Sequence, residues 1–127
     1  MRVRYVFDTG ALISAERRKE RAIRFLRLVH VGRARIFVPL PVIAEWWRGR
    51  SNAREQILAA TEVIGSVAIT KMAGVALAGA RDIDAKLTID AIVMATAAVM
   101  DAVVITGDPA DFAALGRHFP GVSVLTA

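Results

Sequence analysis

Residues 3–10 read VRYVFDTG, and the character of the sequence changes sharply inside this stretch. Val3 to Phe7 are mostly β-branched or aromatic, which indicates a buried strand, and Asp8-Thr9-Gly10 indicates a turn directly after it. Asp8 is therefore expected at the carboxyl end of a strand. In an open parallel sheet, the carboxyl ends of the strands surround the ligand crevice.

From this first strand to the other end of the chain, strand-like and helix-like segments alternate. Strands are expected at residues 3–7, 36–38, 67–70, 102–105 and 122–125, and helices at 17–32, 42–48, 53–64, 72–81 and 88–100, with a short helix after the loop at 106–111. Such alternation favours an α/β fold, with a mainly parallel sheet of about five strands and helices on both faces. We expect residues 1–127 to form a single domain, because the length suits one core.

Composition narrows the class of protein. Hydrophobic residues make up 55% of the sequence, enough for a sizeable core and for an apolar surface where a second subunit could pack. With no Cys, disulfides and thiolate metal sites are excluded, and the cytoplasm is the expected compartment. Asp8 comes too early for a cleaved secretion signal, and Asp101 interrupts the longest apolar stretch, so we expect no membrane segment.

The chain is basic, with a formal charge of +5 that comes from 14 Arg and only 3 Lys against 12 acids. An Arg-rich excess suits a polyanionic partner, because the guanidinium group presents a planar fork to phosphate. Arg48, Arg50 and Arg54 are the best candidates for contact with an RNA backbone, since they follow Glu45 closely. An acidic partner protein would find the same residues attractive.

Four acids are expected at the same edge of the predicted sheet. Asp8 and Asp108 both follow apolar strands, and their carboxylates converge if those strands are neighbours. Asp90 is expected in the first turn of a helix capped by Thr88, and Glu45 can reach the same edge from another helix.

Clustered carboxylates repel one another, and a divalent cation removes that cost. Mg²⁺ or Mn²⁺ favours a few carboxylates together with water and phosphate oxygens, and needs neither His nor Cys. The expected chemistry is therefore metal-dependent hydrolysis of a phosphodiester bond, without a protein nucleophile.

Four segments together resemble the acidic motifs of PIN domains, in order and across nearly the whole chain. They are FDTGALI at 7–13, VIAE at 42–45, IDAIVMATA at 89–97 and VITGD at 104–108. The resemblance implies a three-layer sandwich with strand order 3-2-1-4-5, which places the first and fourth strands side by side.

The same resemblance implies roles for individual residues. Asp8, Glu45 and Asp90 would be metal-binding catalytic acids, with Asp108 in the fourth position and Asp111 as its rival; Thr106 and Thr9 would contribute hydroxyls. The length is similar to that of VapC toxins of toxin-antitoxin pairs. That similarity implies a metal-dependent endoribonuclease that forms a homodimer and is neutralised by a small antitoxin.

Other readings remain open. Asp8 alone could simply cap a turn. A receiver-like signalling module also places acids at strand ends, but the acid after the third strand and the Lys after the fifth are missing here. A haloacid-dehalogenase-like phosphatase would need a second acid where Gly10 stands. A catalytically inactive PIN-like domain that binds RNA or protein is the remaining alternative.

The pair Trp46-Trp47 directly follows Glu45 and is a departure from the family pattern. Adjacent residues on a helix cannot face the same way. We therefore expect one Trp to pack inward and the other to meet a partner or RNA.

Overall fold

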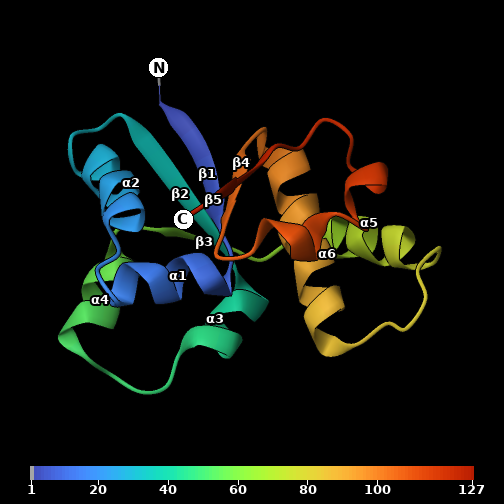
Figure 1. Cartoon of the computed structure of the whole chain (residues 1–127), viewed down its shortest axis with the longest axis horizontal. Helices are drawn as coiled ribbons and strands as arrows, with labels where there is room; N and C mark the ends of the chain where they lie inside the picture. Colours follow the sequence, from blue (N-terminus) through green and yellow to red (C-terminus); the bar gives the residue numbers. More distant parts are fainter. Residues whose placement is uncertain (1) are drawn as a thin grey trace.

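The computed structural model describes residues 2–127, and its centre is a five-stranded sheet (Figure 1). The strands are β1 (Val3–Phe7), β2 (Ala34–Pro39), β3 (Glu62–Ile64), β4 (Val103–Thr106) and β5 (Val124–Thr126). Every pairing is parallel, and the strand order is β3-β2-β1-β4-β5. The predicted order is confirmed, with β1 and β4 side by side.

Helices cover both faces of this sheet. They are α1 (Thr9–Glu16), α2 (Glu20–His30), α3 (Leu40–Trp46), α4 (Asn52–Ala59), α5 (Val67–Leu77) and α6 (Ala85–Met100), with short 3₁₀ turns η1 (Pro109–Phe112) and η2 (Gly116–His118). Helices α1, α2 and α4 lie on one side and α5 and α6 on the other (Figure 1). The predicted three-layer α/β sandwich is confirmed.

The core includes the ends of β1 and β4. Val6 and Phe7 are fully buried and pair in register with Val104 and Ile105, which are also fully buried. Burying a side chain of this size stabilises the fold by about 1.5–3 kcal/mol each. The acids that follow these strands are thus attached to fully buried parts of the sheet.

The first helix, α1, was not expected from the sequence. Residues 8–10 were predicted to form a turn, but Asp8 is the N-cap of a helix that begins at Thr9. Its apolar residues Ala11, Leu12 and Ile13 follow one another directly and no residue of the helix is exposed, so the hydrophobic residues do not fall on one stripe. Without an amphipathic period, sequence patterning does not detect a buried helix of this length.

The prediction was also wrong between residues 53 and 81. The third strand was expected at 67–70, where Val67, Ile69 and Thr70 are β-branched, but this segment begins α5. The Ser66 hydroxyl accepts a hydrogen bond from the Ile69 amide at 3.2 Å and caps that helix, which outweighs the β-propensity. The true third strand, Glu62–Ile64, lies where a helix over 53–64 was expected to end.

Helix α6 begins earlier than expected. Asp84, not Thr88, is its N-cap and accepts a hydrogen bond from the Leu87 amide at 2.8 Å. Asp90 is consequently the sixth residue of α6 and lies in its second turn, not its first. The last strand also begins two residues later than expected, at Val124.

The observed topology decides against one alternative. A receiver-like module has strand order 2-1-3-4-5, and this sheet differs from it. Across residues 2–127, the longest helices fall short of the length and apolar character needed to cross a bilayer.

Candidate functional site

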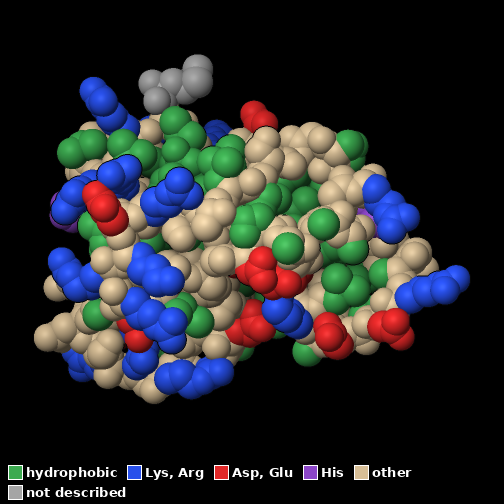
Figure 2. Space-filling model, viewed as in Figure 1, with side chains coloured by type: hydrophobic (Ala, Val, Ile, Leu, Met, Phe, Trp, Pro, Cys, Tyr) green, Lys and Arg blue, Asp and Glu red, His purple; other side chains and the backbone are tan. Residues whose placement is uncertain are grey.

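The acids singled out in the sequence lie around one cavity at the carboxyl end of β1 and β4. Its volume is about 250 Å³. We call it the acidic cavity; its charged lining residues are Asp8, Glu45, Asp90, Asp108, Asp111 and Lys86. Figure 2 shows acidic side chains gathered near the middle of one face, with a basic side chain among them.

Asp8 is buried, with only 8% of its surface exposed. Its backbone amide donates to the Ile105 carbonyl at 3.2 Å, which continues the β1–β4 pairing. One carboxylate oxygen, Oδ1, accepts from the Ala11 amide at 2.8 Å and caps α1. The capping role considered for Asp8 is therefore present, but it uses only one of the two oxygens.

The second oxygen of Asp8 joins it to the loop after β4. Thr106 Oγ1 donates to Asp8 Oδ2 at 2.5 Å and accepts from the Asp108 amide at 3.1 Å. Asp108 in turn caps η1, accepting from the Ala110 amide at 3.1 Å. The buried Thr106 hydroxyl thereby fixes Asp8 and Asp108 relative to each other.

Two glycines allow these loops to approach. A Cβ atom on Gly10 would lie 2.9 Å from the Gly107 amide nitrogen and 3.2 Å from its Cα, both backbone atoms that cannot move aside cheaply. Position 10 must therefore be glycine for α1 to start beside the β4 loop. An acid at position 10, which a haloacid-dehalogenase-like phosphatase would need, has no room here.

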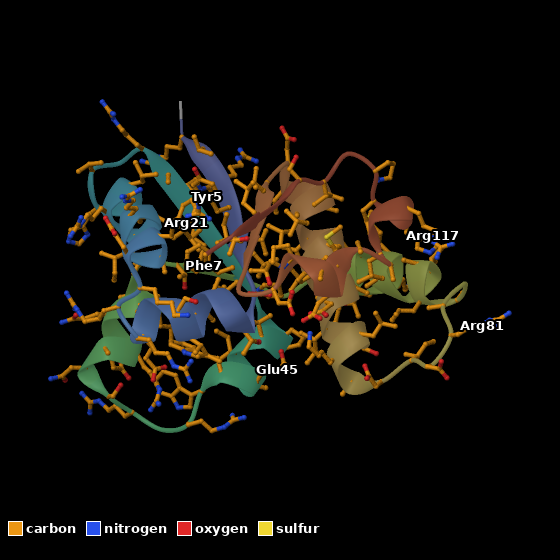
Figure 3. All side chains as sticks on the ribbon, viewed as in Figure 1. Tyr5, Phe7, Arg21, Glu45, Arg81 and Arg117 are labelled. Atoms are coloured by element: carbon orange, nitrogen blue, oxygen red, sulfur yellow. The ribbon has the colours of Figure 1, made fainter. Side chains whose placement is uncertain are left out.

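Glu45 reaches the cavity from α3. Its Oε1 accepts from Thr9 Oγ1 at 2.5 Å, so the first residue of α1 holds the carboxylate in place. Figure 3 shows Glu45 at the edge of α3, below the start of α1. Both Thr9 and Thr106 thus bind cavity carboxylates directly.

Asp90 and Asp111 share a cation, Lys86. The Lys86 ammonium lies 3.2 Å from Asp90 Oδ2 and 2.7 Å from Asp111 Oδ2. Lys86 precedes Asp90 by four residues, so both side chains project from the same face of α6. Lys86 is the single Lys or Arg among the residues that line the acidic cavity.

Burial dominates the electrostatics of the two innermost acids. It raises the pKa of Asp90 to about 6, although the charge of Lys86 and its hydrogen bond oppose the shift. Burial also raises the pKa of Asp8, and the hydrogen bonds from Thr106 and Ala11 offset only part of this. For Lys86, partial burial alone would lower the pKa, but hydrogen bonds to Asp111 and Asp90 and the charge of Asp90 raise it above its usual value.

The donor atoms suit a hard divalent cation, since the cavity offers several carboxylates and its lining includes no His or Cys. Within residues 2–127, however, no three acidic or His side chains are arranged to hold one ion. Thr106, Thr9 and Lys86 engage the carboxylates instead. The fit is therefore one of donor chemistry and location, and a lysine ammonium contacts two of the acids.

The candidate RNA-binding arginines do not line the acidic cavity. Arg54 forms a two-pronged pair with Glu16, at 3.1 Å from Nε to Oε1 and 3.0 Å from Nη2 to Oε2. Arg48 donates to the carbonyl oxygens of Ala44 and Trp47. Arg50, with 84% of its side chain exposed, is the most available of the three.

One of the two adjacent tryptophans packs inward, as predicted. Trp46 is buried and donates from Nε1 to Glu16 Oε1 at 2.8 Å. Trp47 is half-buried and packs edge-on against Trp46, with ring centroids 5.9 Å apart. A partner or RNA contact for Trp47 stays a prediction.

Sequence reasoning missed two residues of these clusters. Lys86 received no role, although its spacing of four from Asp90 on a helix is a signal for an ion pair. Glu16 likewise received no role, but it binds both Arg54 and Trp46. Nothing local in the sequence marks Glu16, because its partners are 30 and 38 residues away.

Comparisons with known proteins agree with this geometry. A model of the PIN domain matches residues 5–117, which include all five acids of the cavity. No curated protein sequence matches the chain significantly.

Several solved structures share the fold. VapBC2 from Rickettsia felis, bound to a DNA fragment from its promoter, aligns with a TM-score of 0.67 at 17% identity over 98% of this chain and 99% of that one. DNA-bound VapBC from Salmonella typhimurium aligns with a TM-score of 0.62 at 19% identity over 98% of both chains. VapBC-1 from nontypeable Haemophilus influenzae aligns with a TM-score of 0.57 at 17% identity, again over 98% of both.

At these identities the structural matches establish the fold alone, whereas the family model covers most of the chain. The strand order and the acidic cavity at the end of β1 and β4 agree with that match. The chain therefore belongs to the PIN domain family.

Proposed function

We propose that this chain is a divalent-metal-dependent endoribonuclease that hydrolyses RNA phosphodiester bonds. The observation that carries the proposal is the acidic cavity, where five carboxylates from distant parts of the chain converge. Two of them, Asp8 and Asp90, are nearly buried at 8% and 7% exposure. Buried acids cost stability unless a cation or a function compensates for them.

Asp8, Glu45 and Asp90 are the proposed metal-binding acids, with Asp108 or Asp111 completing the set. A bound Mg²⁺ or Mn²⁺ would supply a water of lowered pKa and charge stabilisation for the leaving oxygen. Thr106 and Thr9 would hold Asp8 and Glu45 in position through the hydrogen bonds they already make. The basic surface of the chain would attract the RNA backbone.

The direct test is cleavage of total RNA by the purified protein, followed on a gel. We expect cleavage with Mg²⁺ or Mn²⁺ and none after EDTA is added. Intact RNA under every metal condition, with a protein that is folded by circular dichroism, would contradict the proposal.

A second candidate is a PIN-like domain that binds RNA or protein without cleaving it. The observation in its favour is Lys86, whose ammonium lies between Asp90 and Asp111. The same gel assay separates the two, when it is combined with a binding measurement in EDTA. Binding without cleavage in Mn²⁺ would favour the second candidate.

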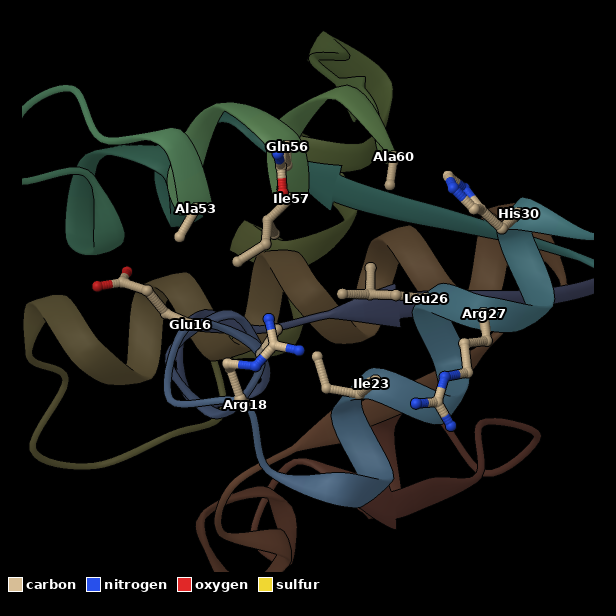
Figure 4. A pocket seen from close by; sticks show the side chains of 11 residues that line it. Glu16, Arg18, Ile23, Leu26, Arg27, His30, Ala53, Gln56, Ile57 and Ala60 are labelled. Carbon is tan, nitrogen blue, oxygen red and sulfur yellow. The ribbon is translucent and has the colours of Figure 1, made fainter.

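We also propose that the protein is the toxin of a toxin-antitoxin pair and acts in the cytoplasm. The structures that share its fold include VapBC complexes from three bacteria. A hollow between α1, α2 and α4 suits a partner segment: Ile23, Leu26 and Ile57 point into it, and Arg18 and Arg27 lie at its rim (Figure 4). An antitoxin segment with apolar and acidic side chains would match this combination.

A homodimer is the expected assembly. Leu40 and Val67 are exposed at 56% and 73%, and both line an apolar hollow between the starts of α3 and α5. Exposed apolar groups of this kind suit an isologous contact. Light scattering at micromolar concentration tests this, and a monomer alone would contradict it.

A further inference from the structure

We propose that Lys86 is a built-in competitor for the metal ion in the acidic cavity. Its ammonium is the cation that pairs with Asp90 and Asp111, and a divalent ion must displace it to bind. This inference rests on the proposed metal dependence and adds a residue that sets the metal affinity.

The contacts of Lys86 carry the first step. Its Nζ lies 2.7 Å from Asp111 Oδ2 and 3.2 Å from Asp90 Oδ2, so one ammonium bridges two carboxylates. These acids come from α6 and η1, and Lys86 therefore links two sides of the cavity. A metal ion that used Oδ2 of Asp90 would meet the ammonium at that oxygen.

The surroundings of Lys86 carry the second step. No other Lys or Arg lines this cavity in the described chain, so Lys86 is the one basic side chain at the acids. Its side chain is 59% exposed, and its long stem can turn to solvent without disturbing the core. Displacement is thus sterically simple and costs mainly the two ion pairs.

A third step follows from charge. Asp90 is the more buried partner, with 10% of its side chain exposed, against 39% for Asp111. A buried carboxylate gains more from a cation than an exposed one, because water screens it less. Removing Lys86 leaves Asp90 without a cation and makes the cavity more attractive to Mn²⁺.

The test compares Mn²⁺ binding by wild type, Lys86→Gln and Lys86→Arg, using isothermal titration calorimetry. We expect Lys86→Gln to bind Mn²⁺ about 5 to 10 times more tightly, as one lost competing charge pair implies. Lys86→Arg retains the cation and should stay near wild type. Lys71→Gln removes the same charge from an exposed site on α5 and is the matched control.

A second readout follows the ammonium itself. In ¹⁵N-lysine NMR spectra of the metal-free protein, Lys86 should give an ammonium signal that is protected by its ion pairs, identified by its loss in Lys86→Gln. Adding Mg²⁺ should remove that protection in wild type. If the signal persists at saturating Mg²⁺, the ion and the ammonium do not compete and the proposal is overturned.

The outcomes separate this inference from the proposed function. Equal or weaker Mn²⁺ affinity in Lys86→Gln would overturn the competition while leaving metal dependence intact. Absence of Mn²⁺ binding by wild type and all variants would overturn both. Tighter binding by Lys86→Gln, with wild-type behaviour of Lys86→Arg and Lys71→Gln, would support the competition.

Discussion

Helix α1 carries an acid at each end, and the two have opposite surroundings. Asp8 caps its first turn, and Glu16 is its last residue. Asp8 accepts hydrogen bonds from an amide and a hydroxyl, neither of which is charged. Glu16 accepts from the Arg54 guanidinium with both oxygens and from the Trp46 indole with one.

The helix dipole explains part of this difference. A carboxylate is favourable at a helix N-terminus and unfavourable at the C-terminus. Asp8 therefore gains from α1 without a cationic partner, whereas Glu16 needs Arg54 to offset its position. We call Glu16, Arg54 and Trp46 the Glu16 cluster. Its carboxylate and its guanidinium neutralise each other, and its hydrogen bonds connect α1 to α3 and α4, which indicates a structural role.

Asp8 is more buried than Glu16, yet no Lys or Arg contacts its carboxylate directly in the described structure. Burial raises its pKa, so the charged form is costly in the metal-free protein. An acid that is buried, held by neutral donors and open to a cavity is suited to receive a cation. The two acids of α1 differ chiefly in their partners: Glu16 is paired with a cationic side chain, and Asp8 is held by uncharged donors.

The largest effect is expected from Asp8→Asn, which should reduce RNA cleavage by about 100-fold or more, as loss of one preorganised polar group does in other active sites. The fold should survive. Asn Oδ1 can still accept from Ala11, and the Thr106 hydroxyl can accept from Asn Nδ2 as well as from the Asp108 amide. Metal-free thermal stability should hold or rise, because a buried charge is removed.

Cleavage rates and melting temperatures with and without Mn²⁺ check this prediction. Asp101→Asn is the control, because Asp101 is an exposed acid at the end of α6 and lies outside the acidic cavity. If Asp8→Asn cleaves RNA at the wild-type rate and Mn²⁺ raises its melting temperature as much as that of wild type, Asp8 is only a helix cap and does not bind the metal.

The pH dependence of stability should reveal Asp90. Its pKa is about 6 in the folded chain, above the usual value of 3.8. Well below pH 3.8 the carboxyl is protonated in both states and costs nothing. As pH rises from 3.8 to about 6, the unfolded state releases its proton while the folded state keeps it, and the folded state loses about 3 kcal/mol of stability relative to the acid form.

Asp90→Asn removes this penalty. In EDTA we expect it to exceed wild type in free energy of unfolding by about 3 kcal/mol at pH 7, with a gap that shrinks toward zero as pH falls below 3.8. Urea titrations at several pH values measure the gap. A gap that is the same at pH 4 and pH 7 would show that Asp90 is not a buried, destabilising charge.

At the other end of α1, Glu16→Ala should cost about 1–2 kcal/mol of stability, since it removes hydrogen bonds to a charged group at a partly exposed site. It should leave the chemistry of the acidic cavity unchanged. Glu20→Ala is the matched control: it removes an exposed Glu–Arg pair, with Arg24, which is worth about 0.5 kcal/mol or less. Urea titrations of both variants measure the difference. Equal losses in free energy of unfolding would show that the Glu16 cluster has no special structural role.

The acidic cavity and the Glu16 cluster also differ in how well the sequence predicts them. The central strands β1 and β4 are apolar runs followed by acids, so their place could be predicted from the residues, whereas their adjacency was implied by the resemblance to PIN domains. Asp8, Glu45, Asp90 and Asp108 were each predicted at the edge where the cavity lies. Such residues show themselves because strand ends converge in any parallel sheet.

The remaining features depend on contacts that local patterns do not encode. Helix α1 is buried on several sides and β3 is only three residues long, so neither has a clear period. The Glu16 cluster joins residues 30 and 38 positions apart. The contact of Lys86 with Asp111 likewise requires η1 to fold back beside α6.

The smallest effect is expected among the arginines near the Glu16 cluster, and it tests which of them is free to meet RNA. Arg50 is 84% exposed, and its nearest acid, Glu55, lies 3.9 Å away, whereas Arg54 is 21% exposed and bound to Glu16. Arg50→Gln should weaken RNA binding a few-fold and lower the slope of log affinity against log salt by about 1, with unchanged stability. Arg54→Gln should instead lower stability and leave the salt slope near wild type, because its charge already serves Glu16. Binding to a mixed-sequence RNA in EDTA, measured by fluorescence anisotropy at several salt concentrations, distinguishes the two. If Arg54→Gln changes the salt slope and Arg50→Gln does not, the division between a structural cluster and a free basic surface is wrong at this end of α1.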